Sequence, residues 1–331
     1  MSTRAAGRTV WFVAAIAAVF LAIGVGLTIR LGHSATWSGG DLTLLPWLLP
    51  LGAGSYLLRF VRWHVLVRQL ASRLPLGRSL RIYLAGFAMG LTPGRLGEFC
   101  KFALLRSATG VPELQSAPIF PLERATEAAS FAALAVAGAS IGHFQPASLG
   151  ASALAMILAL PLLALLALAL RFLSRRSAAS TAGSSWRQLL AGVQSVAGPR
   201  PLALALACAL TARCFDAALF WTAVRAAGVQ LPLPAAALAF GLAGLTGGFS
   251  LLPAGVGAVE ASLVATVAAL GAPAGPALLA ALLARCVTLW LWIPPGLWFA
   301  FRDSSARPIS VVLEPVAVTV PVQTPDMLRA G

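Results

Sequence analysis

Long apolar runs alternate with short arginine-rich segments along the whole chain. A helix that crosses a bilayer needs about 20 predominantly apolar residues. Six segments have that character, at residues 10–29, 42–60, 118–141, 148–170, 201–224 and 276–301. The pattern therefore predicts an all-α polytopic membrane protein with six spanning helices.

Two other apolar regions, residues 82–106 and 234–271, are interrupted before they reach that length. The first is broken by LTPGRLGE, which starts at Leu91, and the second by LLPAGVGAVE, which starts at Leu251. A helical piece of about 12 residues is about 18 Å long, whereas the hydrocarbon core is about 30 Å thick. We therefore predict that each region is a re-entrant helical hairpin with its tip at the break.

The positions of the arginines constrain the topology, because cytoplasmic loops are enriched in Arg. Two loops are strongly basic, one before the first hairpin and one after the span at 148–170. They contain Arg59, Arg62, Arg68, Arg73, Arg78, Arg81, Arg171, Arg175, Arg176, Arg187 and Arg200. With both loops and the chain after the last span in the cytoplasm, the assignment is consistent only if both interrupted regions are hairpins, and these then enter from opposite faces of the membrane. Paired interruptions of this kind indicate an inverted-repeat transporter with a site near the midplane.

One membrane domain, residues 1–301, accounts for all of these segments. The N-terminal run from Val10 to Ile29 is longer than the apolar stretch of about 7–15 residues in a signal peptide, so we expect a retained anchor helix. Residues 302–331 contain several Pro and no helical period, which predicts a disordered tail. The topology places both termini in the cytoplasm.

Composition agrees with a membrane protein and argues against nucleic acid as a partner. The 331 residues are 59% hydrophobic and only 10% charged, with a net charge of +14 that comes almost wholly from Arg. The basic residues cluster between apolar spans, and no basic-aromatic groove or nucleic-acid motif is present. We therefore expect the positive charge to set topology and to attract anionic lipid headgroups.

The sequence offers no catalytic, metal or cofactor motif. The four cysteines, Cys100, Cys208, Cys214 and Cys286, form no CxxC, and we expect them to be buried apolar residues. The three histidines lack metal-ligand spacing. No nucleophile elbow or phosphate-binding loop occurs, so we expect a protein that is not an enzyme and needs no cofactor.

The two breaks share a chemistry suited to an anion. At the first, Pro93, Gly94 and Gly97 permit a tight reversal, while Arg95 adds a charge and Glu98 can pair with it or with Lys101. Free N–H groups at the start of the following helix favour negative charge. The second break repeats the design with Pro253, Gly255, Gly257 and Glu260. The alternative is that each break is a plain loop capped by its Glu.

Further charged residues fall within apolar segments. A charge at the centre of a spanning helix costs about 2.5–3.5 kcal/mol on insertion scales, so such residues should face the protein interior and be paired. The expected partners are the arginines of the first tip and of the spans, Arg95, Arg124, Arg213 and Arg285, and the acids Glu98, Glu123, Glu127, Asp216 and Glu260. These groups form either a transport site or a static ion-pair network that holds the helices together.

Arg59 and Arg62 fall at the predicted cytoplasmic end of the span at 42–60. Three residues apart, they share one helix face. Their long side chains could anchor the helix end at the membrane surface, which is the favoured interpretation. The functional alternative is that they capture an anionic headgroup from the inner leaflet.

Four segments together resemble a known family: RWHVLVRQL, LTPGRLGEFCKFALL, PLERATEAASF and LLPAGVGAVEASLVATVAALG. They are similar to the flippase-like proteins that share the transmembrane region of lysylphosphatidylglycerol synthases, over about residues 10–300. The resemblance implies a lipid-handling membrane domain of the bacterial inner membrane, and it carries over to Pro93, Gly94, Arg95, Gly97, Glu98, Glu123, Arg124, Pro253, Gly257 and Glu260.

This chain departs from the family pattern at two positions. Glu127 stands where the family usually has Asp, and Ala254 stands within a usual Pro-Gly-Gly. The bifunctional synthases also have a soluble aminoacyl-transfer domain after the membrane part. Since this chain ends about 30 residues after its last predicted span, we do not expect synthase activity.

These features favour a lipid transporter or flippase that moves an anionic phospholipid or a polyprenyl- or hopanoid-type lipid between leaflets. Two alternatives stay open. One is a non-catalytic membrane partner of a lipid- or glycan-modifying enzyme, and the other is an ion-coupled transporter of a small solute.

Overall fold

The computed structural model describes residues 41–143 and 184–304, and these residues are helical with no β-strand. The first half contains η1 (Leu42–Leu44), α2 (Leu45–Val67), α3 (Leu76–Met89), η2 (Pro93–Phe99), α4 (Cys100–Thr109), α5 (Glu113–Ser116) and α6 (Ile119–Ile141). The second half contains α8 (Ser184–Val196), α9 (Pro199–Ala226), α10 (Leu233–Phe249), η5 (Pro253–Gly255), α11 (Ala258–Ala269), α12 (Ala274–Thr288), η6 (Trp290–Trp292) and α13 (Ile293–Ser304).

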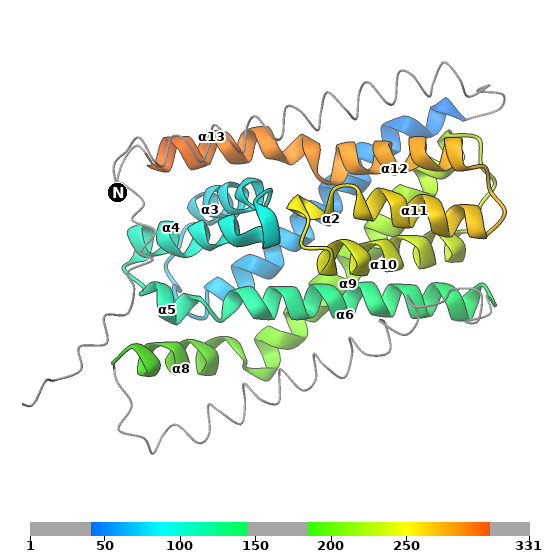
Figure 1. Cartoon of the computed structure of the whole chain (residues 1–331). Helices are drawn as coiled ribbons and strands as arrows, with labels where there is room; N and C mark the ends of the chain where they lie inside the picture. The colour runs from blue at the N-terminus through cyan, green and yellow to red at the C-terminus, as the bar shows by residue number, and fades with distance from the viewer. Residues whose placement is uncertain (1–40, 144–183, 305–331) are drawn as a thin grey trace, which may run out of the picture.

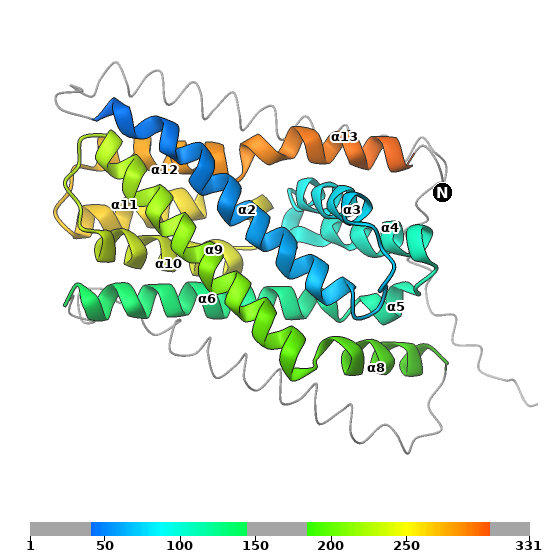
Figure 2. The same ribbon diagram turned by 180° about the vertical axis from the view of Figure 1, so that it is seen from behind.

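The helices pack along one long axis, with α2 crossing α9 on one side and α6 running beneath α10 (Figures 1 and 2). Small residues allow the close contact between α6 and α10. A Cβ added at Gly138 would lie 2.5 Å from the backbone nitrogen of Leu238, and one at Gly241 would lie 2.7 Å from Ala135. Such close approach of backbones is the usual way that helices associate in membranes, where apolar burial alone gives no preference for protein over lipid.

Three described segments are long and apolar enough to cross a membrane: Leu42–Val67, Pro199–Ala226 and Ala274–Arg302. They correspond to three of the six predicted spans, as expected for a multi-pass membrane protein. The first extends seven residues past its predicted end at residue 60. The third is not one straight helix, because α12 stops at Thr288 and the chain bends at Leu289 (φ −125°, ψ −65°) before α13 begins.

The other predicted spans have different outcomes. The helix α6 matches the prediction for 118–141 closely, but it is not among the three apolar spans, since Glu123, Arg124 and Glu127 lie in its first half. The predicted spans at 10–29 and 148–170 lie outside the described residues, as does the predicted tail from residue 305. The helix α13 continues to Ser304, three residues into that tail.

Each interrupted region forms a pair of short helices joined at its break. Figure 1 shows α3 and α4 at one end of the molecule and α10 and α11 at the other, with their connections facing each other near the middle. The two connections, η2 and η5, are in contact. Leu91 and Ala254, one from each connection, share an apolar cluster with Leu289 and Ile293 at the bend between α12 and α13.

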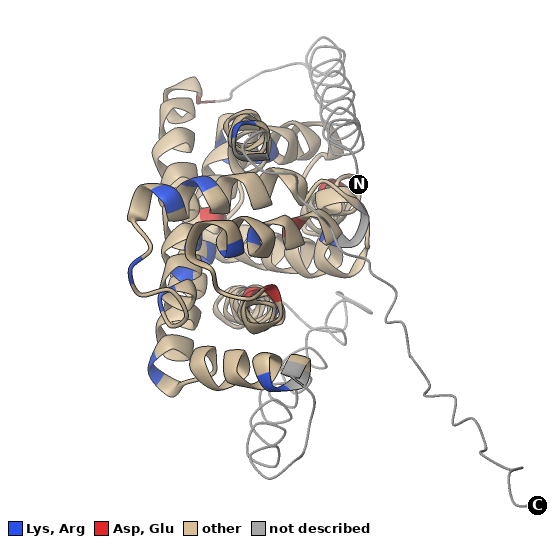
Figure 3. Cartoon of the chain, turned by 90° about the vertical axis from the view of Figure 1, so that its left-hand side faces the viewer, with Lys and Arg blue, Asp and Glu red and all other residues tan. Residues whose placement is uncertain are grey.

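Exposed arginines gather at the end of the molecule that carries α3, α4 and α8. Figure 3 looks onto this end and shows its basic positions in blue. The exposed arginines there lie in the loop after α2, in α3, in α8 and at the ends of α4 and α9. They include Arg68, Arg73, Arg78, Arg81, Arg106, Arg187 and Arg200. In the described part of the chain the long axis is therefore electrically polarised, with Asp41 and Arg225 at the opposite end.

Candidate functional site

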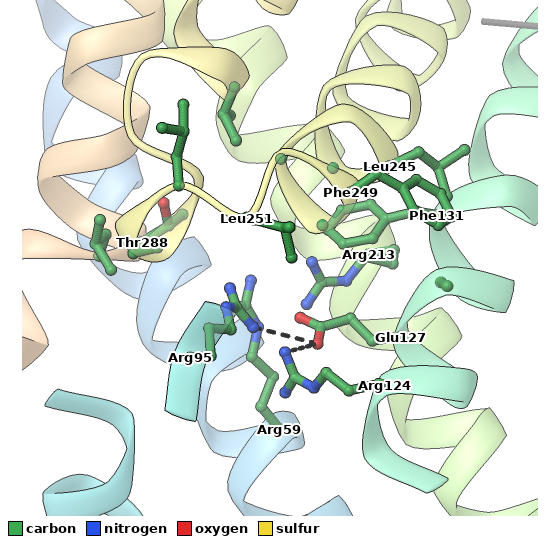
Figure 4. A pocket seen from close by; sticks show the side chains of 18 of the residues that line it. Arg59, Arg95, Arg124, Glu127, Phe131, Arg213, Leu245, Phe249, Leu251 and Thr288 are labelled. Carbon is green, nitrogen blue, oxygen red and sulfur yellow. Dashed lines mark ion pairs between the residues drawn. The ribbon is translucent and has the colours of Figure 1, made fainter. Parts of the chain in front are cut away.

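A cavity of about 480 Å³ lies where the two connections meet α2, α6 and α9. Figure 4 shows its charged side chains, with Arg59, Arg95, Arg124 and Arg213 arranged around the carboxylate of Glu127. A fifth arginine, Arg285 of α12, also lines the wall. The remaining lining is mostly apolar and aromatic, and it includes Phe87, Phe120, Phe131, Phe240, Leu245, Phe249, Leu251, Leu252, Val259 and Leu289.

Two arginines of the first half share two acids at the cavity wall. Arg124 Nη1 lies 2.7 Å from Glu127 Oε2, and Arg124 Nη2 lies 3.6 Å from Glu98 Oε2. Arg95 Nη1 lies 3.7 Å from a carboxylate oxygen of each of the same two acids. About a third of the Arg95 and Arg124 side chains is exposed, so both can reach a bound ligand.

Behind this wall lies a fully enclosed lysine. Lys101 Nζ donates to Glu123 Oε2 at 2.8 Å and lies 3.4 Å from Glu98 Oε2. It also stands over the ring of Trp63, 4.7 Å from the centroid, which is a cation–π contact. Since Lys101 and Glu123 are both buried, this pair fixes α4 against α6 from inside and positions Glu98.

A third ionic group joins α2 to α9. Arg59 Nη2 lies 2.7 Å from Asp216 Oδ2, and Arg213 Nη1 lies 3.0 Å from the same oxygen. The other oxygen of Asp216, Oδ1, is buried with no hydrogen-bond partner among the described residues. The Arg213 guanidinium also lies 4.3 Å from the centre of the Phe131 ring. One acid thus serves two arginines of the cavity wall.

The second connection is held by Arg285. Its Nε donates to Glu260 Oε1 at 2.7 Å, and its Nη2 donates to the carbonyl oxygen of Ala254 at 2.9 Å. The other oxygen of Glu260 accepts from the backbone N–H of Gly257 at 2.7 Å, which caps the start of α11. Arg285 therefore links α12 to both sides of the break.

The backbone is strained at both breaks. Four non-glycine residues of the described chain have positive φ, and three of them lie here: Arg95 (58°), Leu251 (55°) and Ala254 (50°). Conformations of this kind cost about 1–3 kcal/mol and concentrate at functional sites, where the surrounding contacts maintain them. Gly255 (68°) and Gly257 (88°) adopt positive φ without that cost.

The structure brings together every charged partner that the sequence analysis proposed. All four arginines and all five acids of that set belong to the four ionic groups above. Pro93 and Gly94 begin η2, and Pro253 begins η5, as expected for the two breaks. Gly97 fits tightly, since a Cβ there would lie 2.2 Å from the carbonyl oxygen of Met89.

Arg59 and Arg62 are not at a helix end. The helix α2 continues to Val67, so Arg59 lies in the cavity wall and Arg62 is 3% exposed. The interpretation of these residues as surface anchors is therefore wrong, because neither side chain leaves the packed interior. Arg62 Nε and Nη1 have no hydrogen-bond partner among the described residues.

Two further features of the site were not predicted. The first is the buried pair of Lys101 and Glu123, because the sequence analysis proposed Lys101 only as a partner for Glu98. A lone lysine three residues after a glutamate in an apolar segment is a signal for a buried pair. The aromatic wall has no local signature, since its members come from α3, α6 and α10.

The cysteine prediction also needs correction, because Cys214 and Cys286 are exposed on α9 and α12. No cluster of three potential metal ligands occurs in the described part of the chain.

This fold and site define a multi-pass membrane protein with a charged, aromatic-walled cavity between two opposed pairs of short helices. The chain matches the lysylphosphatidylglycerol synthase TM region over residues 10–296 and belongs to that family. Comparisons with curated proteins and with solved structures found no match.

Proposed function

We propose that this protein moves a lipid with an anionic headgroup between the two leaflets of the bacterial inner membrane. One observation carries the proposal: the cavity wall holds five arginines and one acid, Glu127, within an apolar and aromatic surround. Guanidinium groups bind phosphate through paired hydrogen bonds, which are strong in a site of low dielectric constant. The family supports a lipid-related role.

The edge of the cavity suits the acyl chains of such a lipid. Phe249, Leu251 and Leu252 line the cavity and are also exposed, to 59%, 71% and 45%. Large apolar residues with this exposure are favoured next to lipid tails rather than water. In the proposed arrangement, the headgroup occupies the arginine-lined cavity and the tails remain in the bilayer beside the second connection.

The two opposed helix pairs would provide access from the two leaflets. We propose that they are the re-entrant hairpins, with their contacting connections at the midplane as in inverted-repeat transporters. The arginine-rich end would face the cytoplasm, as would both termini. Glu98 and Glu260 would pair with arginines in the empty site and release them to the headgroup. The protein would act as a transporter with no catalytic step.

The test is exchange of fluorescent phospholipids between leaflets of vesicles that contain the purified full chain. Anionic lipids should exchange faster than in protein-free vesicles. Arg95→Ala and Arg285→Ala should each slow this exchange about tenfold, because loss of a hydrogen bond to a charged group is worth about 1.5–3 kcal/mol. Arg106→Ala is the matched control, since Arg106 pairs with Glu113 at the exposed surface.

Two results would contradict the proposal. Exchange at the control rate in both cavity variants would mean that the arginines do not bind the transported lipid. No exchange of any lipid by the purified protein would favour the alternative of a membrane partner for a lipid- or glycan-modifying enzyme.

A further inference from the structure

The charges of the site do not balance within the protein. Seven cationic groups belong to the cavity wall and the layer behind it: Arg59, Arg62, Arg95, Lys101, Arg124, Arg213 and Arg285. Five carboxylates accompany them: Glu98, Glu123, Glu127, Asp216 and Glu260. With all of these groups ionised, the cluster carries two more positive than negative charges.

The rest of the chain cannot supply the two missing carboxylates from its predicted membrane segments. Residues 1–40 and 144–183 lie outside the described part and contain no Asp or Glu. Asp41 is engaged at the start of η1, where it accepts from Thr43, and Glu113 pairs with Arg106 at the surface. Asp303, Glu314 and Asp326 follow the last predicted span, so no carboxylate of the predicted membrane segments is left to balance the cluster. A bound anion would supply the missing counter-charge.

The excess is concentrated where α2 crosses α9. Arg59 and Arg213 both use one oxygen of Asp216, and Arg62 on the next turn of α2 adds a third guanidinium. Arg213 Nε and Nη2, like Arg62 Nε and Nη1, are buried donors without an acceptor among the described residues. An uncompensated charge in a membrane interior is costly, so an anion bound beside this crossing is strongly favoured.

We infer that the site selects a lipid whose headgroup carries two negative charges on one unsubstituted phosphate, that is, a lipid phosphomonoester. This inference rests on the proposed function and adds the charge class of the headgroup. A phosphodiester lipid such as phosphatidylglycerol brings one negative charge and leaves one arginine uncompensated. A zwitterionic headgroup brings no net charge. A phosphomonoester neutralises the cluster, and its three free oxygens match the several forked donors around Glu127 (Figure 4).

The test compares three tail-labelled lipids with identical acyl chains: phosphatidic acid, phosphatidylglycerol and phosphatidylcholine. Exchange is measured in vesicles with the full chain at about pH 9. This is well above the second pKa of a phosphomonoester, which is near 6 in solution and higher at a negatively charged surface, so the headgroup of phosphatidic acid carries two charges. The background in protein-free vesicles is subtracted. We expect phosphatidic acid to exchange at least about tenfold faster than phosphatidylglycerol at equal mole fraction, because one further charge-assisted contact is worth about 1.5 kcal/mol or more.

Two variants change the cluster charge in opposite directions. Arg213→Gln removes one cation while Asp216 keeps Arg59 as its partner, and it should bring the ratio of the two rates close to one. Glu127→Gln removes one acid while Arg124 keeps Glu98, and it should raise the ratio above that of the wild type. Arg106→Gln should leave the ratio unchanged. General misfolding would slow every lipid and could not move the ratio up in one variant and down in the other.

The outcomes separate this inference from the proposed function. Clear exchange of both anionic lipids with no preference for phosphatidic acid would overturn the charge assignment and leave the flippase intact. A shift of the ratio in the same direction in both variants would also overturn it. Uptake of radiolabelled inorganic phosphate, with no exchange of any lipid, would overturn the lipid assignment and the proposed function together.

Discussion

At the scale of single residues, the ionic groups of this protein share partners instead of forming separate pairs. Asp216 serves Arg59 and Arg213, and Glu98 lies near Arg95, Lys101 and Arg124. Because each carboxylate is shared, a few acids can pair with several cations in apolar surroundings. It also means that the loss of one acid affects more than one cation.

The pair of Lys101 and Glu123 should be important for stability. Removing one member of a buried ion pair costs about 3–5 kcal/mol, because the other charge stays behind. Since Lys101 keeps Glu98 at 3.4 Å, we expect Glu123→Gln to destabilise the protein by about 3 kcal/mol. The measurement is denaturant unfolding of the purified protein in detergent micelles.

Arg106→Gln provides the comparison for that measurement. Its pair with Glu113 is exposed, and exposed pairs contribute about 0–1 kcal/mol. Equal unfolding midpoints for Glu123→Gln and Arg106→Gln would show that the buried pair does not stabilise the fold.

At the scale of elements, the sequence located the two breaks well but not the ends of the helices around them. The helix α3 begins at Leu76, six residues before the interrupted region predicted at 82–106. Arg78 and Arg81 are exposed and compatible with a helix, but they lie outside the apolar run from which the region was predicted. The bend between α12 and α13 was missed. The bend lies at Leu289, and Pro294 and Pro295 lie in the first turn of α13, where their missing N–H groups need no partner and favour the start of a new helix.

Close packing at the first break predicts a sensitive glycine. Gly97→Ala would place a Cβ 2.2 Å from the Met89 carbonyl oxygen, which belongs to the backbone of the opposing helix end. The connection must then shift, and we expect a loss of at least about 2 kcal/mol in unfolding free energy together with slower lipid exchange.

Gly77→Ala is the matched control for this substitution. Gly77 lies in α3 with no atom within 4 Å of the added Cβ. Alanine there should be neutral or stabilise the helix by about 0.5–1 kcal/mol. If the two variants had the same stability, the close approach at Gly97 would have no energetic importance.

At the scale of the whole molecule, the contact between the two connections is the central feature. We expect that transport requires η2 and η5 to separate. Cysteines at Leu91 and Ala254, in a background without the four native cysteines, should be joined by a short bifunctional reagent. Cross-linking should stop lipid exchange, and a cleavable reagent should restore it on reduction.

The control pair places cysteines at Gly77 and Gly275, at the starts of α3 and α12, which Figure 1 shows at opposite ends of the molecule. This pair should not cross-link. Unchanged exchange in the fully cross-linked Leu91–Ala254 variant would show that the two connections move as one body.

The polarised long axis predicts the orientation in the membrane. Gly77→Cys and Gly275→Cys, each introduced alone, are suitable labelling sites, because neither position has a neighbour that a side chain would displace. In right-side-out vesicles, a membrane-impermeant maleimide should label Gly275→Cys and leave Gly77→Cys unlabelled, since the arginine-rich end should be cytoplasmic. Inverted vesicles should give the reverse pattern. Labelling of Gly77→Cys in right-side-out vesicles would reverse the assigned topology.

The sequence by itself determined the membrane class, the two breaks and the identity of the ionic residues. These are properties of local hydropathy and spacing, and they depend only on neighbours along the chain. Arg213 and Asp216 illustrate this, because residues three apart on a helix meet whatever the helix packs against.

Only the tertiary structure decided which charges meet across helices and where the cavity lies. Arg59 reaches Asp216 across 157 residues of sequence because α2 crosses α9 at that point, and the predicted span end gave no sign of it. The aromatic wall and the contact of the two connections likewise depend on helix crossing and register. These are set by side-chain packing over the whole molecule, which the hydropathy of single segments does not specify.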